Sequence, residues 1–103
     1  MSQIFHKEGH MKTKELCIKI PEYSGEAINY KWEDGYEIKV EIIGDEFAII
    51  ANREGLLSLA NHCLNLAQEG MPPNSYMRFE VGNSLMEGSF PFILERDDTL
   101  PNV

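Results

Sequence analysis

The stretch NREGLLSLANHCLNLAQEGM, from Asn52 to Met71, decides the fold. Its apolar residues recur at i, i+3, i+4, i+7, i+8 and i+11, which is the spacing of one face of an α-helix. We therefore predict an amphipathic helix over about 52–69 that packs its apolar face on a sheet. The apolar face carries Leu56, Leu59, Ala60, Cys63, Leu64 and Ala67, and the face expected to meet water carries Ser58, Asn61, His62, Asn65, Gln68 and Glu69.

Both ends of this helix are marked in the sequence. Asn52 is a favourable N-cap, because its side-chain oxygen can accept a hydrogen bond from a free N–H of the first turn. Gly70 is expected at the C′ position of a Schellman ending, with Leu66 and Met71 as its hydrophobic pair. Pro72 prevents the helix from continuing.

Alternation of apolar and polar residues predicts four strands before the helix. The first strand ends at Pro21, and its apolar positions are Leu16, Ile18 and Ile20. The other three strands, at 27–33, 36–43 and 46–51, form a meander.

Side-chain parity selects the two loops of this meander. A three-residue loop at 33–35 keeps Trp32 beside Tyr36 and places Gly35 in the left-handed region. A two-residue loop at Gly44-Asp45 keeps the apolar residues of its strands together. It pairs Ile43 with Glu46, Ile42 with Phe47, and Val40 with Ile49.

Two further strands are expected after the helix. In the strand at 76–81, Met77, Phe79 and Val81 point inward. The last strand has Phe90, Phe92 and Leu94 on one face, and Pro91 indicates an edge position or a strand start.

These elements predict an α+β fold in the order β-β-β-β-α-β-β. One amphipathic helix, at about 52–69, would cover one face of a two-layer, mainly antiparallel sheet of five to six strands. The 103 residues fit a single domain, 1–103, with a flexible arm at 1–13 and a loose tail at 97–103.

The chain is acidic, with a formal net charge of −8. This charge opposes nucleic-acid binding, which needs a basic face. It favours a basic protein partner, or it serves solubility alone. No apolar run approaches the about 20 residues of a membrane span, and the N-terminus lacks an apolar signal segment. We therefore expect a cytoplasmic protein that does not contact a membrane.

The chain contains no recognisable catalytic, cofactor or metal motif. Cys17 and Cys63 lack a CxxC spacing and are expected to be buried, although a disulfide between them stays open. His6 and His10 have a helical ligand spacing but no third ligand nearby. His62 follows Ser58 by one turn without an orienting acid, and we expect it on the surface. A non-enzymatic protein is the favoured interpretation.

We expect function to lie on the sheet face turned away from the helix. That face carries alternating charges on the strands at 36–43 and 76–81, with some apolar side chains among them. The simplest alternative is that these charges only solvate the sheet. The candidate partner-binding residues are Tyr76, Arg78, Glu80, Glu37, Lys39 and Glu41.

Four segments carry a resemblance to a known family. They are the helix ANREGLLSLANHCLNLAQEG, the turn Pro72-Pro73-Asn74-Ser75, NSLMEGS at 83–89, and a closing strand that ends Leu94-Glu95-Arg96. From Ala51 onward the chain resembles small bacterial proteins grouped with predicted immunity proteins of polymorphic toxin systems. The resemblance implies an α+β fold and a role in binding another protein.

The strand after the helix departs from the family pattern. Members of the family often have His-x-His-x-Asp there, whereas this chain has Tyr76, Arg78 and Glu80, of which only the acid is similar. Any ligand or metal held by those histidines is therefore not expected here.

Three hypotheses follow. The first is a non-enzymatic domain that binds a protein partner, with a basic cognate toxin as the candidate. The second is a small-molecule binder or enzyme that uses Tyr76, Arg78 and Glu80 in a pocket. The third is a self-associating structural protein that forms a homodimer.

Overall fold

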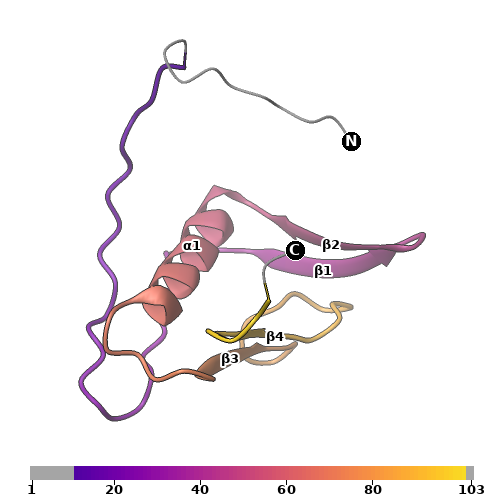
Figure 1. Cartoon of the computed structure of the whole chain (residues 1–103). Coiled ribbons are helices and arrows are strands. Elements are labelled where there is room, and N and C mark those ends of the chain that lie inside the picture. The colour runs from indigo at the N-terminus through magenta and orange to yellow at the C-terminus, as the bar shows by residue number, and fades with distance from the viewer. Residues whose placement is uncertain (1–10, 102–103) are drawn as a thin grey trace.

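The computed structural model of the protein describes residues 11–101. Its elements are β1 (Ile38–Ile43), β2 (Glu46–Ala51), α1 (Arg53–Ala67), β3 (Tyr76–Phe79) and β4 (Phe92–Glu95). β1 pairs antiparallel with β2, and β3 pairs antiparallel with β4, in two separate two-stranded sheets (Figure 1). The predicted sheet of five to six strands and the order β-β-β-β-α-β-β are therefore wrong.

The hairpin of β1 and β2 has the predicted register. Ile43 pairs with Glu46, and the same register puts Ile42 opposite Phe47 and Val40 opposite Ile49. Gly44 has a φ of +62°, which suits the first central position of a type II′ turn. The two-residue loop is confirmed, because only this register keeps the apolar side chains of both strands on one face.

The second edge of β1 is occupied by the loop after β3. The N–H groups of Met86 and Phe90 donate to the carbonyls of Ile38 and Val40 at 2.9 and 3.0 Å. The N–H of Val40 donates to Ser89 Oγ at 3.0 Å. The two hairpins are therefore joined through the segment 86–90.

The strands expected at 16–20 and 27–33 are not formed. Their segment runs irregularly along α1 (Figure 1), and helix side chains bind its main chain where a neighbouring strand was expected. Asn61 Nδ2 donates to the carbonyl of Lys19, and Asn65 Nδ2 donates to the carbonyl of Asn29, both at 2.8 Å. These bonds satisfy carbonyls that a sheet would otherwise have to pair.

Two more helix residues hold the same segment. Gln68 Nε2 donates to the carbonyl of Pro21 at 3.0 Å, and Gln68 Oε1 accepts from the N–H of Tyr23 at 2.9 Å. The N–H of Glu33 donates to Ser58 Oγ at 2.8 Å. The polar face of α1 is therefore a binding surface for main-chain groups. We call Ser58, Asn61, Asn65 and Gln68 the polar helix face.

The helix is consequently rotated from its predicted orientation. Ser58, Asn61 and Asn65 are buried, whereas Leu56 is 56% and Leu64 48% exposed. The expected apolar face, with Cys63 and Ala67, lies at the surface, and only Leu59 and Ala60 of that set are partly buried. Cys17 and Cys63 are free and exposed, so the prediction that they are buried is also wrong.

The helix starts as predicted but ends earlier. Asn52 is the N-cap, and its Oδ1 accepts from the N–H of Gly55 at 2.8 Å. Gln68 is an extended C-cap, so Gly70 is not at C′ and the Schellman ending is wrong. Gly70, with a φ of +91°, instead sits in a turn closed by a bond from the N–H of Met71 to the carbonyl of Gln68.

β3 and β4 form where alternation predicted strands, but each is shorter than the predicted strand. Met77 and Phe79 are fully buried, as predicted. Val81 is exposed, because the carbonyl of Glu80 accepts from the N–H groups of 83–85 and turns the chain away. β4 begins directly after Pro91, so the strand-start interpretation of that proline is confirmed.

The buried core lies where α1 meets the two hairpins. It consists of Ile38, Val40, Leu66, Met77, Phe79 and Leu85. Trp32 and Tyr36 pack against it and stack on each other at 4.3 Å, which confirms that these two side chains lie together. Gly35 has the expected positive φ of +79°, although no strand precedes it.

Gly55 marks the closest approach between α1 and β1. A Cβ atom there would lie 2.5 Å from the carbonyl oxygen of Glu37 and 3.0 Å from Ile38 Cγ1. Gly55→Ala is therefore expected to destabilise the protein by about 1–3 kcal/mol in urea unfolding, because the helix must move off the strand. In an ordinary helix interior the same change stabilises by about 1 kcal/mol.

A reverse substitution at an exposed site of the same helix is the matched control. Ala67→Gly is expected to cost no more than the usual helix propensity, about 1 kcal/mol. A Gly55→Ala protein as stable as the wild type would show that helix and strand are not in contact at this point.

Candidate partner-binding surface

The outer face of β3 carries Tyr76 and Arg78, and Glu80 follows the strand on the same side by alternation. All three side chains are exposed. Within residues 11–101, neither Arg78 nor Glu80 takes part in an ion pair. The three side chains stand in a row on an open strand face, so they do not form the enclosed pocket that the small-molecule hypothesis requires.

The outer face of β1 carries the second charged group. Lys39 Nζ and Glu41 Oε2 lie 3.3 Å apart, so this pair is partly neutralised. Glu37 precedes the strand and is exposed, while its N–H and carbonyl are both bonded to Asn52. The structure thus brings Lys39 and Glu41 together and leaves the carboxylate of Glu37 free for solvent or a partner.

A hollow of about 440 Å³ lies between the start of β1 and the loop that follows β3. Glu37 lines it from the start of β1, and residues 82–86 line it from the loop that follows Glu80. The base of the loop is held by the N–H of Glu80, which donates to Asn83 Oδ1 at 3.0 Å and to Ser84 Oγ at 3.3 Å. Glu37 is the acidic side chain among the residues that line this hollow.

Beneath β3 lies an aromatic cluster that includes His62. This histidine is fully buried, so its predicted surface position is wrong. Its ring centroid is 4.4 Å from that of Trp32, 5.4 Å from that of Phe79 and 5.6 Å from that of Tyr30. Burial lowers the pKa of His62 from 6.5 to about 4, so the imidazole is neutral at pH 7.

The cluster does not contain a Ser–His pair. Neither ring nitrogen of His62 has a hydrogen-bond partner among the described residues, and Ser58 Oγ accepts from the main chain of Glu33. The cluster instead supports the charged strand, since the hydroxyl of Tyr30 accepts from the N–H of Arg78 at 3.2 Å. The burial of His62 in this cluster could not be predicted from local pattern, because its ring neighbours Tyr30, Trp32 and Phe79 are distant in the chain.

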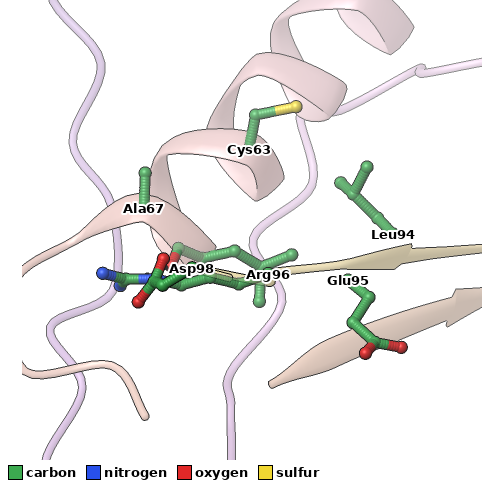
Figure 2. Close-up of a pocket in the computed structure, with 7 residues that line it drawn as sticks. Cys63, Ala67, Leu94, Glu95, Arg96 and Asp98 are labelled. Carbon is green, nitrogen blue, oxygen red and sulfur yellow. Dashed lines mark hydrogen bonds and ion pairs between the residues drawn. The ribbon is translucent and has the colours of Figure 1, made fainter. Parts of the chain in front are cut away.

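An open groove of about 370 Å³ separates the end of α1 from β4 (Figure 2). Cys63 and Ala67 lie on its helix side and Leu94 on its strand side, whereas the carboxylate of Glu95 points away from the helix. Arg96 Nη1 lies 3.0–3.3 Å from the carbonyls of Leu66, Gln68 and Met71. Arg96 thus caps the negative end of the helix.

A second exposed surface was missed in the sequence. It is the outward side of α1, which we call the apolar helix stripe: Leu56, Ala60, Cys63, Leu64 and Ala67. The helical spacing of these residues was visible in the sequence, but it was assigned to the core. One face of the helix carries apolar side chains and the other carries polar ones. Helical spacing separates these two faces, but it does not show which of them is buried.

The described residues contain neither a cluster of metal ligands nor a membrane-spanning helix. No group of three or more His, Cys, Asp or Glu side chains in residues 11–101 is arranged to hold a metal ion. The part of the chain that the structure describes has no helix long and apolar enough to cross a membrane. The ligand spacing of His6 and His10 lies outside the described residues.

The described residues form a small α+β fold of one helix and two antiparallel hairpins, with charged side chains exposed on both hairpins. The family model described as Immunity protein 32 matches residues 46–97, half of the chain, and the protein belongs to this family. The matched region runs from β2 through β4 and includes Tyr76, Arg78 and Glu80, so the resemblance seen from Ala51 onward is confirmed. No curated protein and no solved structure matches the chain.

Proposed function

We propose that the protein is a non-enzymatic, cytoplasmic immunity protein that binds a basic cognate toxin and neutralises it. Membership of the Immunity protein 32 family carries this proposal, because immunity proteins act on a protein partner. The binding surface is formed by Tyr76, Arg78, Glu80, Glu37, Lys39 and Glu41.

The charge distribution supports a basic partner. The net charge is −8, and within residues 11–101 the exposed carboxylates of Glu37 and Glu80 take part in no ion pair. An acidic surface of this kind attracts a basic protein and accelerates its association, most strongly at low ionic strength. Arg78 and Tyr76 lie beside the acids, and both residue types are enriched at protein interfaces.

Co-expression with the product of a neighbouring gene, as the candidate toxin, tests the proposal. The wild-type protein is expected to co-purify with the toxin and to restore growth of cells that express it. Glu37→Lys together with Glu80→Lys is expected to weaken the complex at least about tenfold at low salt, mainly through slower association. Surface plasmon resonance or a comparable binding assay measures both rates.

The matched control is Glu26→Lys together with Glu69→Lys. It makes the same change of charge at exposed positions away from the two hairpins, and it is expected to leave the association rate closer to that of the wild type. Equal losses in the two double variants would mean that net charge, and not this surface, governs binding. A wild-type protein that neither binds the toxin nor protects cells would contradict the proposed function itself.

A further inference from the structure

The first hairpin has one paired edge and one open edge. On β1, the carbonyls of Ile38 and Val40 accept hydrogen bonds from the segment 86–90, so the main-chain groups of these two residues point away from β2. Main-chain groups alternate along a strand, and the residues of β1 between them are therefore the ones that bond to β2. β1 thus has neighbours on both edges, whereas β2 pairs with β1 alone among residues 11–101 (Figure 1).

Three residues of β2 carry the open edge. Ile49 lies opposite Val40, so its N–H and carbonyl point away from β1, and alternation gives Phe47 and Ala51 the same direction. Within residues 11–101, no hydrogen bond reaches the main-chain groups of these three residues. A row of free N–H and carbonyl groups is a template for another strand, so the chemistry of this edge specifies an extended main chain as its occupant.

Side-chain burial also indicates a missing neighbour. Val40 and Ile49 lie opposite each other on the same face of the hairpin, yet Val40 is fully buried and Ile49 is 41% exposed. Phe47, on the same face of β2, is 51% exposed. A strand added beside β2 would cover both side chains, because opposite residues on neighbouring strands lie about 4.5–5.5 Å apart.

β2 lacks the features that keep the edges of natural sheets unpaired. Its six residues, EFAIIA, include no proline and no lysine, and its register with β1 contains no bulge. The charged residue of the strand, Glu46, lies at its start, so five uncharged residues follow in a row. An edge of this kind is expected to pair with another strand.

The sequence of β2 is complementary to itself in one antiparallel register. With a two-fold axis at Ile49, Phe47 of one copy faces Ala51 of the other, and Ala48 faces Ile50. Large side chains then lie opposite small ones on both faces of the sheet. The same register pairs all the main-chain groups of the open edge, because Phe47, Ile49 and Ala51 of each copy face the same set in the other.

Neighbouring registers fit less well. The axis at Ile49 sets Glu46 against the uncharged Asn52. An axis at Ala48 would set Glu46 against Ile50, and an axis at Ile50 would leave Phe47 opposite the first residue of α1, beyond the strand. The distribution of size and charge along β2 therefore favours a second copy of this chain in a single register.

We propose that the protein forms a homodimer in which the β2 strands of two copies pair antiparallel about Ile49 and join the two first hairpins into one sheet. The contact is made by main-chain groups at the edge of β2, whereas the proposed toxin surface lies on the outer faces of β1 and β3. The dimer therefore does not depend on the proposed function.

Amide hydrogen exchange followed by NMR tests the pairing of the edge. The amides of Phe47, Ile49 and Ala51 are expected to exchange at least about tenfold more slowly at high protein concentration than at low concentration. The amides of Ala48 and Ile50 bond to β1 and are expected to be protected at both concentrations. In sedimentation analysis the mass is expected to rise from 11.8 kDa towards twice that value. A mass that stays at 11.8 kDa, or exchange at the three edge amides that does not depend on concentration, overturns the proposal.

A charge on the two-fold axis tests the position of the contact. Ile49→Lys sets two like charges opposite each other and is expected to be monomeric with an unchanged circular dichroism spectrum. The control Ile43→Lys makes the same change at a position of β1 that is 54% exposed, and it is expected to dimerise like the wild type. Ile49→Pro removes the outward N–H without adding charge, which an edge strand tolerates, and is also expected to be monomeric. A dimer that survives in folded Ile49→Lys or Ile49→Pro overturns the proposal.

The register is tested in a dimer that mixes labelled and unlabelled chains. The α protons of Ala48 in one copy and Ile50 in the other are expected to give a nuclear Overhauser effect, because residues of a non-hydrogen-bonded pair approach most closely. A contact between the Ala48 residues of both copies would place the axis elsewhere and overturn the arrangement. Binding of the candidate toxin by monomeric Ile49→Lys reports on the proposed function separately.

Discussion

Replacing Phe79 with alanine is expected to lower the free energy of unfolding by about 3–5 kcal/mol. The side chain is fully buried, and it stacks on Phe92 with ring centroids 4.8 Å apart. It also contacts His62 at 5.4 Å, and both Trp32 and Tyr30 at 6.0 Å. Phe79 of β3 therefore packs against the helix, the irregular segment and β4 at once, so the cavity cannot easily collapse.

Phe90 provides the control for this measurement. It is the same residue type but half exposed, so Phe90→Ala is expected to cost about 1 kcal/mol or less in urea unfolding. If the two alanine variants lost similar amounts, the aromatic cluster would not be the centre of the core. The difference in unfolding free energy between the two variants cancels the general effect of truncating a phenylalanine side chain and isolates the contribution of its burial.

Acidification is expected to destabilise the protein through His62. Its pKa is about 4 in the folded state and 6.5 in the unfolded chain, because burial disfavours the charged imidazole. Between these values the unfolded chain binds a proton that the folded protein does not, so stability falls as the pH falls. The loss begins near pH 6.5, ends near pH 4 and amounts to about 3 kcal/mol.

A His62→Leu variant isolates this effect from the titration of the carboxylates. Both ring nitrogens of His62 lack partners in the described part of the chain, so leucine removes no hydrogen bond there. Unfolding free energies of the two proteins are expected to converge or cross as the pH is lowered from 7 to 4, since only the wild type loses the histidine contribution. Parallel pH profiles would contradict the buried, neutral state of His62, which NMR titration of its ring protons also reports.

The local pattern was sufficient to predict the elements whose partners are close in sequence. Alternation of apolar and polar residues correctly predicted the register of the first hairpin and the burial of Met77 and Phe79. The residue type of Asn52 correctly predicted the N-cap of the helix. Side-chain alternation predicts the register of a hairpin because a shift of one residue would move every apolar side chain of the strand to the opposite face of the sheet. The same alternation predicted that Tyr76 and Arg78 would be exposed.

The errors have a common physical cause. The residues at 16–20 and 27–33 alternate like strands, but main-chain groups of Lys19, Asn29 and Glu33 are bonded to side chains 25 to 42 positions away. Helical periodicity distinguishes two faces without showing which one is buried, and polar side chains can be buried when their bonds are satisfied. The helix orientation, the burial of His62 and the exposure of the apolar helix stripe all follow from those distant bonds.

The polar helix face also bears on how sequence can change in this protein. Asn61, Asn65 and Gln68 bind carbonyl oxygens, which every amino acid provides, so they place little demand on which side chains the segment 19–33 carries. The region matched by the family model, 46–97, contains these helix residues but not the segment that they hold. Side chains of the segment 19–33 that face away from the helix can therefore be substituted while the segment keeps its path along the helix.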